Sequence, residues 1–272
     1  ILTRMATADL SYGEALKEAM DKGYAEADPT LDINGMDAAH KAVIIASLAY
    51  GSWLPSDSMH VEGIEAVELI DMQFASKLGY SIKLLSVIKG HDDGSIEVRT
   101  QPSLIPLDHI LASVHGVFNA IAVHGDIVGE TLFYGSGAGQ NPTSSSVISD
   151  LADAAMAIAG SKPRSSFVPH GIYGKPVAIE DTTSRYYLRL EAEARPGVLA
   201  QIAGLLADHQ IGIISVLQPD EGQGQDPQTA QLILTLHEAR YGDAVAARDA
   251  IAQLSCILDK PALFRIETLD PQ

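Results

Sequence analysis

The chain has 272 residues, 46% of them hydrophobic, so it is long enough for two domains with cores of their own. Its 18 basic and 35 acidic side chains give a formal net charge of −17, which argues against binding to nucleic acid or to an anionic membrane surface. No run of about 20 apolar residues occurs, so no membrane span is expected. A single cysteine, Cys256, excludes an internal disulfide and fits a cytoplasmic protein.

The chain begins with a series of predicted helices. Residues 1–9 fit the end of one helix, and Ser11 caps a second helix that Gly23 ends. The apolar run that follows predicts a helix over 41–50, and apolar spacing predicts another over 64–78.

In the middle of the chain, apolar and polar residues alternate with a period of two, which predicts strands. Residues 81–90 and 95–105 flank His-Asp-Asp-Gly, which indicates a hairpin. Residues 113–125 and 126–136 continue the antiparallel pattern, and a helix is expected over 142–159. We therefore expect a mixed or antiparallel sheet with helices on one face.

The last third of the chain predicts a second unit. Residues 161–184 are rich in Pro, Ser and Gly and read as a linker. Over 185–272 the expected elements follow the order βαββαβ, which is the ferredoxin-like pattern. The predicted fold class is therefore α+β.

The densest group of ionisable residues lies in 19–41, AMDKGYAEADPTLDINGMDAAHK. Lys41 follows Asp37 by four residues, which puts both side chains on one helix face. The next nine residues are almost wholly apolar, so Lys41 is expected to enter a cleft or a core, where its pKa would fall and it could exchange protons near neutral pH. The alternative is an ordinary i,i+4 ion pair at the start of a core helix.

Two glycine-containing turns are candidate ligand sites. Residues 135–146, GSGAGQNPTSSS, leave bare backbone amides just before a predicted helix, although a tight strand-to-helix turn explains them equally well. Pro196 and Gly197 open a helix in the last unit, and helix initiation alone accounts for both. The nine histidines form no i,i+4 pair, so no metal site is expected in this chain.

The run A-x-x-x-G-Y-A-E-A-D-P-x-x-D-I-x-G-x-D-x-x-x-K, from Ala19 to Lys41, resembles the signature of homoserine dehydrogenases. The segment GSGAGQNPT is similar to the glycine turn of the same family, and RPGVLAQI resembles ACT domains, which bind small amino acids. The resemblance implies a catalytic, substrate and dimerisation domain over 1–160, whose 141–160 helix packs on a nucleotide-binding domain. It also implies an ACT regulatory domain over 185–272.

The activity that this resemblance implies is the NAD(P)-dependent interconversion of L-homoserine and L-aspartate 4-semialdehyde, in the biosynthesis of threonine, methionine and isoleucine. Lys41 would be the acid and base, with Asp37 as its catalytic partner. The implied substrate-binding residues are Tyr24, Glu26, Asp32 and Asp37. The implied cofactor-binding residues are Gly23, Gly137, Ala138 and Gly139, and the implied effector-binding residues are Pro196, Gly197 and Val198.

The resemblance further implies a homo-oligomer, either dimer or tetramer, an amino-acid effector such as L-threonine, and a monovalent cation such as sodium in the complete enzyme. The chain opens at Ile1 without an initiator Met or a glycine-rich dinucleotide turn, so we expect a fragment that is inactive alone. Two other classes stay open: an amino-acid-sensing ACT protein without catalysis, and a different reductase or lyase that uses the same carboxylate and lysine residues.

Overall fold

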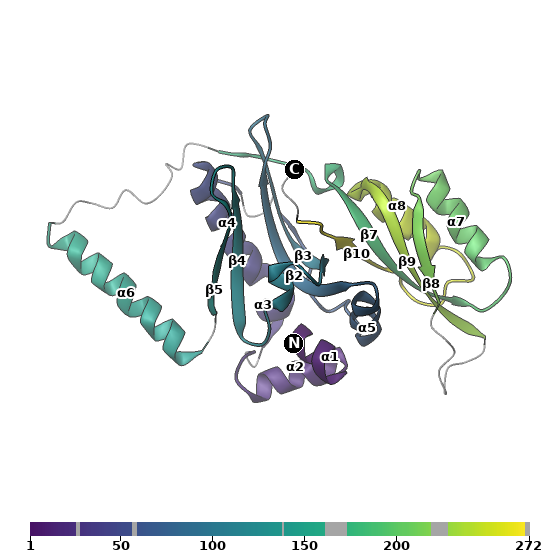
Figure 1. The fold of residues 1–272 in the computed structure, drawn as a ribbon, viewed down its shortest axis with the longest axis horizontal. Helices are drawn as coiled ribbons and strands as arrows, with labels where there is room; N and C mark the ends of the chain where they lie inside the picture. Colours follow the sequence, from purple (N-terminus) through teal and green to yellow (C-terminus); the bar gives the residue numbers. More distant parts are fainter. Residues whose placement is uncertain (26–27, 56–58, 138, 161–172, 219–227, 270–272) are drawn as a thin grey trace.

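The computed structural model describes residues 1–25, 28–55, 59–137, 139–160, 173–218 and 228–269 (Figure 1). Its larger sheet has eight strands, and the strand path runs β1-β3-β10-β7-β9-β8, with β2 and β6 also paired to β3. Strands β4 and β5 form a separate two-stranded sheet. The architecture is mixed α+β, as predicted.

The N-terminal helices are α1 (Leu2–Ala8), α2 (Tyr12–Asp21), α3 (Thr30–Ile33), α4 (Met36–Tyr50) and α5 (Leu69–Lys77). The predicted capping box of α2 is confirmed, because the Ser11 side chain accepts from the Glu14 amide and the Glu14 carboxylate accepts from the Ser11 amide. Helix α5 starts later than its apolar spacing predicts. The reason is a second capping box, between Glu68 and Asp71, that sets its first turn.

Helix α4 is bounded by two glycines in the left-handed conformation. Gly35 precedes it with φ 82°, and Gly51 follows it with φ 65°. Because L-residues rarely adopt a positive φ, these glycines define where the helix starts and stops. The helix therefore starts at Met36 rather than at Lys41 and includes Asp37 in its first turn.

The predicted hairpin is confirmed. Strands β2 (Tyr80–Gly90) and β3 (Ser95–Pro106) pair from Tyr80↔Pro106 to Gly90↔Ile96. The short strand β1 (His60–Val61) runs parallel to β3, as does β6 (Lys175–Pro176), which lies in the predicted linker. The 3-10 turns are η2 (Ile110–Ser113) and η3 (Ile179–Asp181).

The second sheet is a hairpin of β4 (Phe118–Gly125) and β5 (Gly129–Ser136), followed by helix α6 (Gln140–Ile158). None of the described residues of α6 is buried. Figure 1 shows α6 projecting away from the eight-stranded sheet. This part of the molecule therefore exposes much of its apolar surface.

The C-terminal unit has the predicted order βαββαβ. Its elements are β7 (Thr183–Glu193), α7 (Val198–Asp208), β8 (Ile213–Leu217), β9 (Thr229–Arg240), α8 (Tyr241–Ala252) and β10 (Ala262–Ile266). Strands β10, β7, β9 and β8 lie side by side and antiparallel. The sheet does not end at β10, however, because β10 also pairs in parallel with β3, through Arg265↔Ser103 and Ile266↔Leu104.

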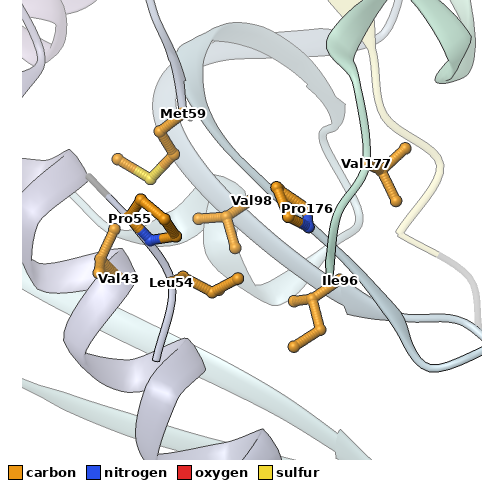
Figure 2. Close-up of a pocket in the computed structure, with 8 residues that line it drawn as sticks. All are labelled: Val43, Leu54, Pro55, Met59, Ile96, Val98, Pro176 and Val177. Carbon is orange, nitrogen blue, oxygen red and sulfur yellow. The ribbon is translucent and has the colours of Figure 1, made fainter. Parts of the chain in front are cut away.

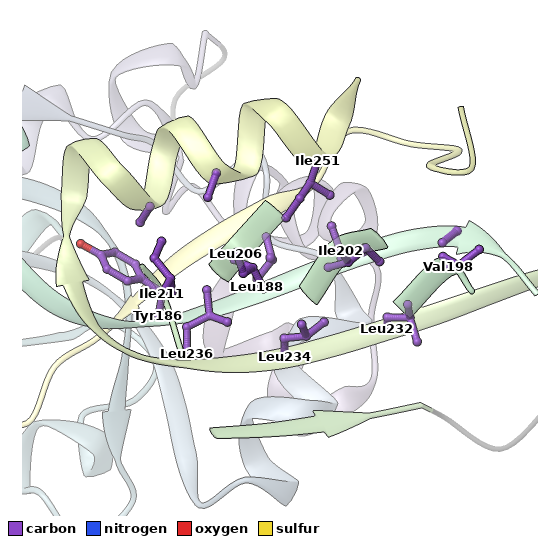
Figure 3. Packing of buried hydrophobic residues seen from close by; sticks show 14 of the residues in the cluster. Tyr186, Leu188, Val198, Ile202, Leu206, Ile211, Leu232, Leu234, Leu236 and Ile251 are labelled. Atoms are coloured by element: carbon purple, nitrogen blue, oxygen red, sulfur yellow. The ribbon is translucent and has the colours of Figure 1, made fainter. Parts of the chain in front are cut away.

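Successive side chains of β7 enter different hydrophobic clusters, because strand residues alternate between the two faces of a sheet. Tyr186 and Leu188 pack with α7 and α8, as Figure 3 shows. Tyr187 packs with Phe264 of β10 and with Phe74 of α5. The second cluster therefore joins the N-terminal helices to the C-terminal strands.

A buried carboxylate also joins the two parts. Asp71 of α5 is fully buried and accepts hydrogen bonds from Tyr187 Oη at 3.0 Å and Arg189 Nε at 2.8 Å, both on β7. Glu68 pairs with the other side of the same guanidinium, at 2.7 Å from Nη2. A buried ion pair costs desolvation, but the loss of one partner costs more, because the remaining charge stays buried.

We therefore predict that Asp71→Ala lowers the free energy of unfolding by about 3–5 kcal/mol, since it leaves Arg189 buried without its main partner. Urea unfolding measures this change. The matched control is Asp181→Ala, which removes a carboxylate from an exposed pair with Arg240 and is expected to change stability by no more than about 1 kcal/mol. Equal losses in the two variants would contradict the importance of the buried link.

Candidate functional site

Residues 19–41 comprise the end of α2, the turn that follows it, the short helix α3 and the start of α4. Gly23, with φ 69°, follows the end of α2, and the Gly23 and Tyr24 amides donate to the carbonyls of Met20 and Ala19. The side chain of Tyr24 lies 54% exposed, so it is available to a ligand. Glu26 lies outside the described residues.

The next turn is organised by short polar side chains. Asp28 accepts from the Thr30 hydroxyl at 2.5 Å and from the Thr30 amide at 3.2 Å, and these bonds hold the pKa of Asp28 below its usual value. Asp32 lies exposed on α3. Asn34 then accepts from the Met36 amide at 2.9 Å, which satisfies a free N–H at the start of α4.

The Asp37–Lys41 pair lies at the surface. Lys41 Nζ donates to Asp37 Oδ2 at 2.5 Å, and the two side chains are 59% and 62% exposed, Asp37 and Lys41 respectively. The expectation that Lys41 enters a buried cleft or a core is therefore wrong. The reason is that α4 buries only one face; the apolar Ile44 and Leu48, three and seven residues after Lys41, remain exposed beside it. The buried face of α4 consists of Ala39, Ala42, Val43, Ala46 and Ser47.

The buried face of α4 is fixed against the sheet. Figure 2 shows the apolar pocket between Val43 of α4, Ile96 and Val98 of β3, and the segment around Pro176. Its volume of about 10 Å³ is too small for a ligand, so this pocket is a packing interface. The residues that line it are Val43, Leu54, Pro55, Met59, Ile96, Val98, Pro176 and Val177.

The loop that leads into α4 rests on a neighbouring backbone segment. The Ile64 amide donates to the Ile33 carbonyl at 2.8 Å, and a Cβ on Gly35 would lie 2.9 Å from the Glu62 carbonyl oxygen. A Cβ on Gly63 would lie 2.4 Å from the same Ile33 oxygen. Glycine is therefore required on both sides of this contact. No sequence pattern indicates Glu62 or Gly63 as site residues, and only the glycine itself signals a close approach of two backbone segments.

The second candidate turn lies on other elements, between β5 and α6. Gly137 approaches Asn119 of β4 so closely that a Cβ would lie 1.7 Å from its Nδ2 atom. Gly139, with φ 111°, precedes the first turn of α6, and Ala138 lies outside the described residues. Local packing thus explains Gly137, whose amide donates to the Val117 carbonyl at 3.3 Å, and backbone conformation explains Gly139.

The third candidate turn opens α7. Gly197 has φ 91°, and no atom lies within 4 Å of the position where its Cβ would be. Val198 is 3% exposed because its side chain belongs to the core under α7 and α8. Only the backbone amide of Val198 is therefore available to a ligand, beside Pro196 and Gly197.

The described residues contain no group of three or more His, Cys, Asp or Glu side chains arranged to hold a metal ion. Within the same residues, no helix has the length and apolar character needed to cross a bilayer.

Comparison with known proteins identifies the family. A family model described as homoserine dehydrogenase matches residues 1–152. The homoserine dehydrogenase of Pseudomonas aeruginosa is 42% identical over 262 residues, which cover 94% of this chain and 60% of that protein. The homoserine dehydrogenase of Neisseria gonorrhoeae is 39% identical over 274 residues, with coverage of 99% and 62%.

Solved structures agree with this result. A homoserine dehydrogenase from Thiobacillus denitrificans has a TM-score of 0.86 and 37% identity, and the match covers 99% of this chain and 61% of that one. The enzyme from S. aureus has a TM-score of 0.68 at 28% identity. The chain thus spans about 60% of the length of the relatives that it matches. The resemblance found in residues 19–41 is confirmed, and the chain belongs to the homoserine dehydrogenase family.

Proposed function

We propose that this chain supplies the substrate and catalytic part of an NAD(P)-dependent enzyme that interconverts L-homoserine and L-aspartate 4-semialdehyde in the cytoplasm. The observation that carries the proposal is the surface pair of Asp37 and Lys41 at the start of α4, inside the region matched by the family model. The product of this reaction would serve the synthesis of threonine, methionine and isoleucine.

Lys41 acts as the proton donor and acceptor. Reduction of the semialdehyde produces an alkoxide at the terminal carbon, and Lys41 Nζ supplies its proton; in the reverse direction the same nitrogen takes the proton from the alcohol. Asp37 accepts a hydrogen bond from Lys41 Nζ and so holds the ammonium in one orientation. In this scheme Tyr24, Glu26 and Asp32 bind the amino-acid end of the substrate.

The nicotinamide cofactor supplies the hydride acceptor or donor for the reaction. Most of it would bind to a nucleotide-binding domain. From this chain, Gly23 and the turn of Gly137, Ala138 and Gly139 would approach its nicotinamide end. The bare amides at the start of α6 fit a polar group of such a ligand. A monovalent cation such as sodium would bind mainly upstream of these residues.

The exposed apolar side chains fit two interfaces. On α6, Ile148 and Leu151 are exposed, which supports packing of this helix on a nucleotide-binding domain. On the β4–β5 hairpin, Phe133, Ile127 and Val128 are exposed, which supports a homodimer or a higher oligomer through this sheet.

The C-terminal unit acts in this proposal as an ACT regulatory domain over 185–272 that binds an amino acid such as L-threonine. The open turn at Gly197 supports it, because bare amides before a helix suit a carboxylate.

The first test is Lys41→Ala in the full-length gene product, with homoserine oxidation followed by the absorbance of the reduced nicotinamide. Loss of a general acid and base is expected to lower kcat by about 10²–10⁴-fold. Lys22→Ala is the matched control, because Lys22 is likewise exposed and paired to Glu18 at i,i+4. Normal turnover in Lys41→Ala would refute the role of Lys41.

The second test is calorimetric titration of the full-length gene product with L-threonine, L-isoleucine, L-methionine and L-serine. We expect one of them to bind, and Gly197→Ala to weaken that binding because the left-handed turn is disturbed. Gly129→Ala is the matched control: Gly129 also has a positive φ and open space around it, but lies in the β4–β5 turn. If none of the four binds, the effector proposal fails.

A further inference from the structure

The backbone segment of residues 60–64 lies between the loop that precedes Lys41 and the C-terminal unit. On one side, Tyr241 Oη donates to Glu62 Oε1 at 2.6 Å, and His60 Nε2 lies 2.8 Å from the same oxygen. Tyr241 is the first residue of α8, is 9% exposed, and its amide donates to the Thr182 carbonyl at 2.9 Å. The position of the hydroxyl is therefore set by the anchored backbone of Tyr241 and by the burial of its ring.

The ring of Tyr241 is fixed on two sides. His60 meets it edge to face, with centroids 5.1 Å apart, and the Arg265 guanidinium lies 4.7 Å from its centroid. Burial, followed by the nearby Glu62 carboxylate, raises the pKa of the Tyr241 phenol, so the hydroxyl remains a donor. Burial raises the pKa of Glu62, but hydrogen bonds from His60 and Tyr241 outweigh it and hold the pKa below its usual value. The bond is therefore charge-assisted, which makes it stronger than a neutral one.

On the other side, the same segment supports the loop before α4. The Ile64 amide holds the Ile33 carbonyl, and Gly35 lies against the Glu62 carbonyl with no room for a Cβ. The Glu62 amide donates to the Thr100 carbonyl of β3 at 2.8 Å, which keeps the segment in register with the sheet. Residues 60–64 therefore contact both α8, through Tyr241, and the loop before α4.

We propose that Tyr241 is a positioning residue for the homoserine dehydrogenase reaction. Its hydrogen bond to Glu62 holds residues 60–64 against the loop that orients Asp37 and Lys41. The C-terminal unit therefore contributes directly to the catalytic geometry, whether or not it binds an effector. This inference rests on the proposed function, because it assigns Lys41 to the chemistry.

The test compares Tyr241→Phe with the wild-type full-length gene product. The substitution removes one hydroxyl and keeps the ring against His60 and Arg265. We expect kcat for homoserine oxidation to fall by about 10–100-fold, as a small misplacement of a catalytic group causes, while KM for the nicotinamide cofactor stays unchanged. Assays run well below the melting temperature of each variant.

Tyr186→Phe is the matched control. Tyr186 is a neighbouring buried tyrosine whose hydroxyl has no hydrogen-bond partner among the described residues, so its removal is expected to leave kcat unchanged. Glu62→Gln is the conservative variant, because its amide oxygen still accepts from Tyr241; it is expected to retain most of the kcat that Glu62→Ala loses. The double variant Tyr241→Phe/Glu62→Ala is expected to be no slower than Glu62→Ala, since both remove the same bond.

The outcomes separate the two proposals. Unchanged kcat in Tyr241→Phe, with an active wild-type protein, would overturn the positioning role alone and leave the proposed function standing, whatever Glu62→Ala does. A fall in melting temperature without a fall in kcat would do the same, because it would show a purely structural bond. If the wild-type protein does not oxidise homoserine with either NAD or NADP, the proposed function fails and the positioning role fails with it.

Discussion

The parallel pairing of β10 with β3 is the contact on which the rest of the structure depends. It places Glu267, which follows β10, 2.8 Å from the buried Arg99 of β3, which also pairs with Glu97 of its own strand at 2.6 Å. Separation of the two strands would leave Arg99 without Glu267, and a buried charge that loses a partner is costly. The pairing makes one sheet of the N-terminal hairpin and the βαββαβ unit, and it brings residues far apart in sequence into one core.

The sequence predicted those elements whose signals are local. The capping box of Ser11, the hairpin around His91–Gly94 and the βαββαβ order all depend on residues close in the chain. The joining of the β2–β3 hairpin and the βαββαβ unit into one sheet depends on pairing between distant strands, which no local pattern encodes. Strands β1 and β6 have two residues each, too few to show a period, so the segment around Lys175 read as a linker.

The residues of the candidate site remain a prediction, whereas the environment predicted for Lys41 is wrong. The signature of 19–41 points to Asp37 and Lys41, and the apolar run after Lys41 predicts a helix that is buried on all sides. Helix α4 instead buries mainly alanines on one face and exposes Ile44 and Leu48 on the other. Composition alone does not distinguish a helix that is buried on all sides from a helix that has a second apolar face exposed to solvent in this chain. Glu62 was missed because its role arises from contacts to Gly35 and Tyr241, both distant in sequence.

Besides the Arg99–Glu267 pair, polar links among the described residues join the N-terminal part to the C-terminal unit on both sides of the sheet. Asp71 binds Tyr187 and Arg189 beside the cluster that contains Phe264, while Glu62 binds Tyr241, which belongs to the cluster under α7 and α8. Backbone pairing of two strands alone permits some rotation about the strand axis, but links on both faces oppose rotation in either direction. The C-terminal unit is therefore not a tethered domain that moves freely. In the proposed function, an amino acid bound to this unit would act on the site through shifts of the sheet and of residues 60–64.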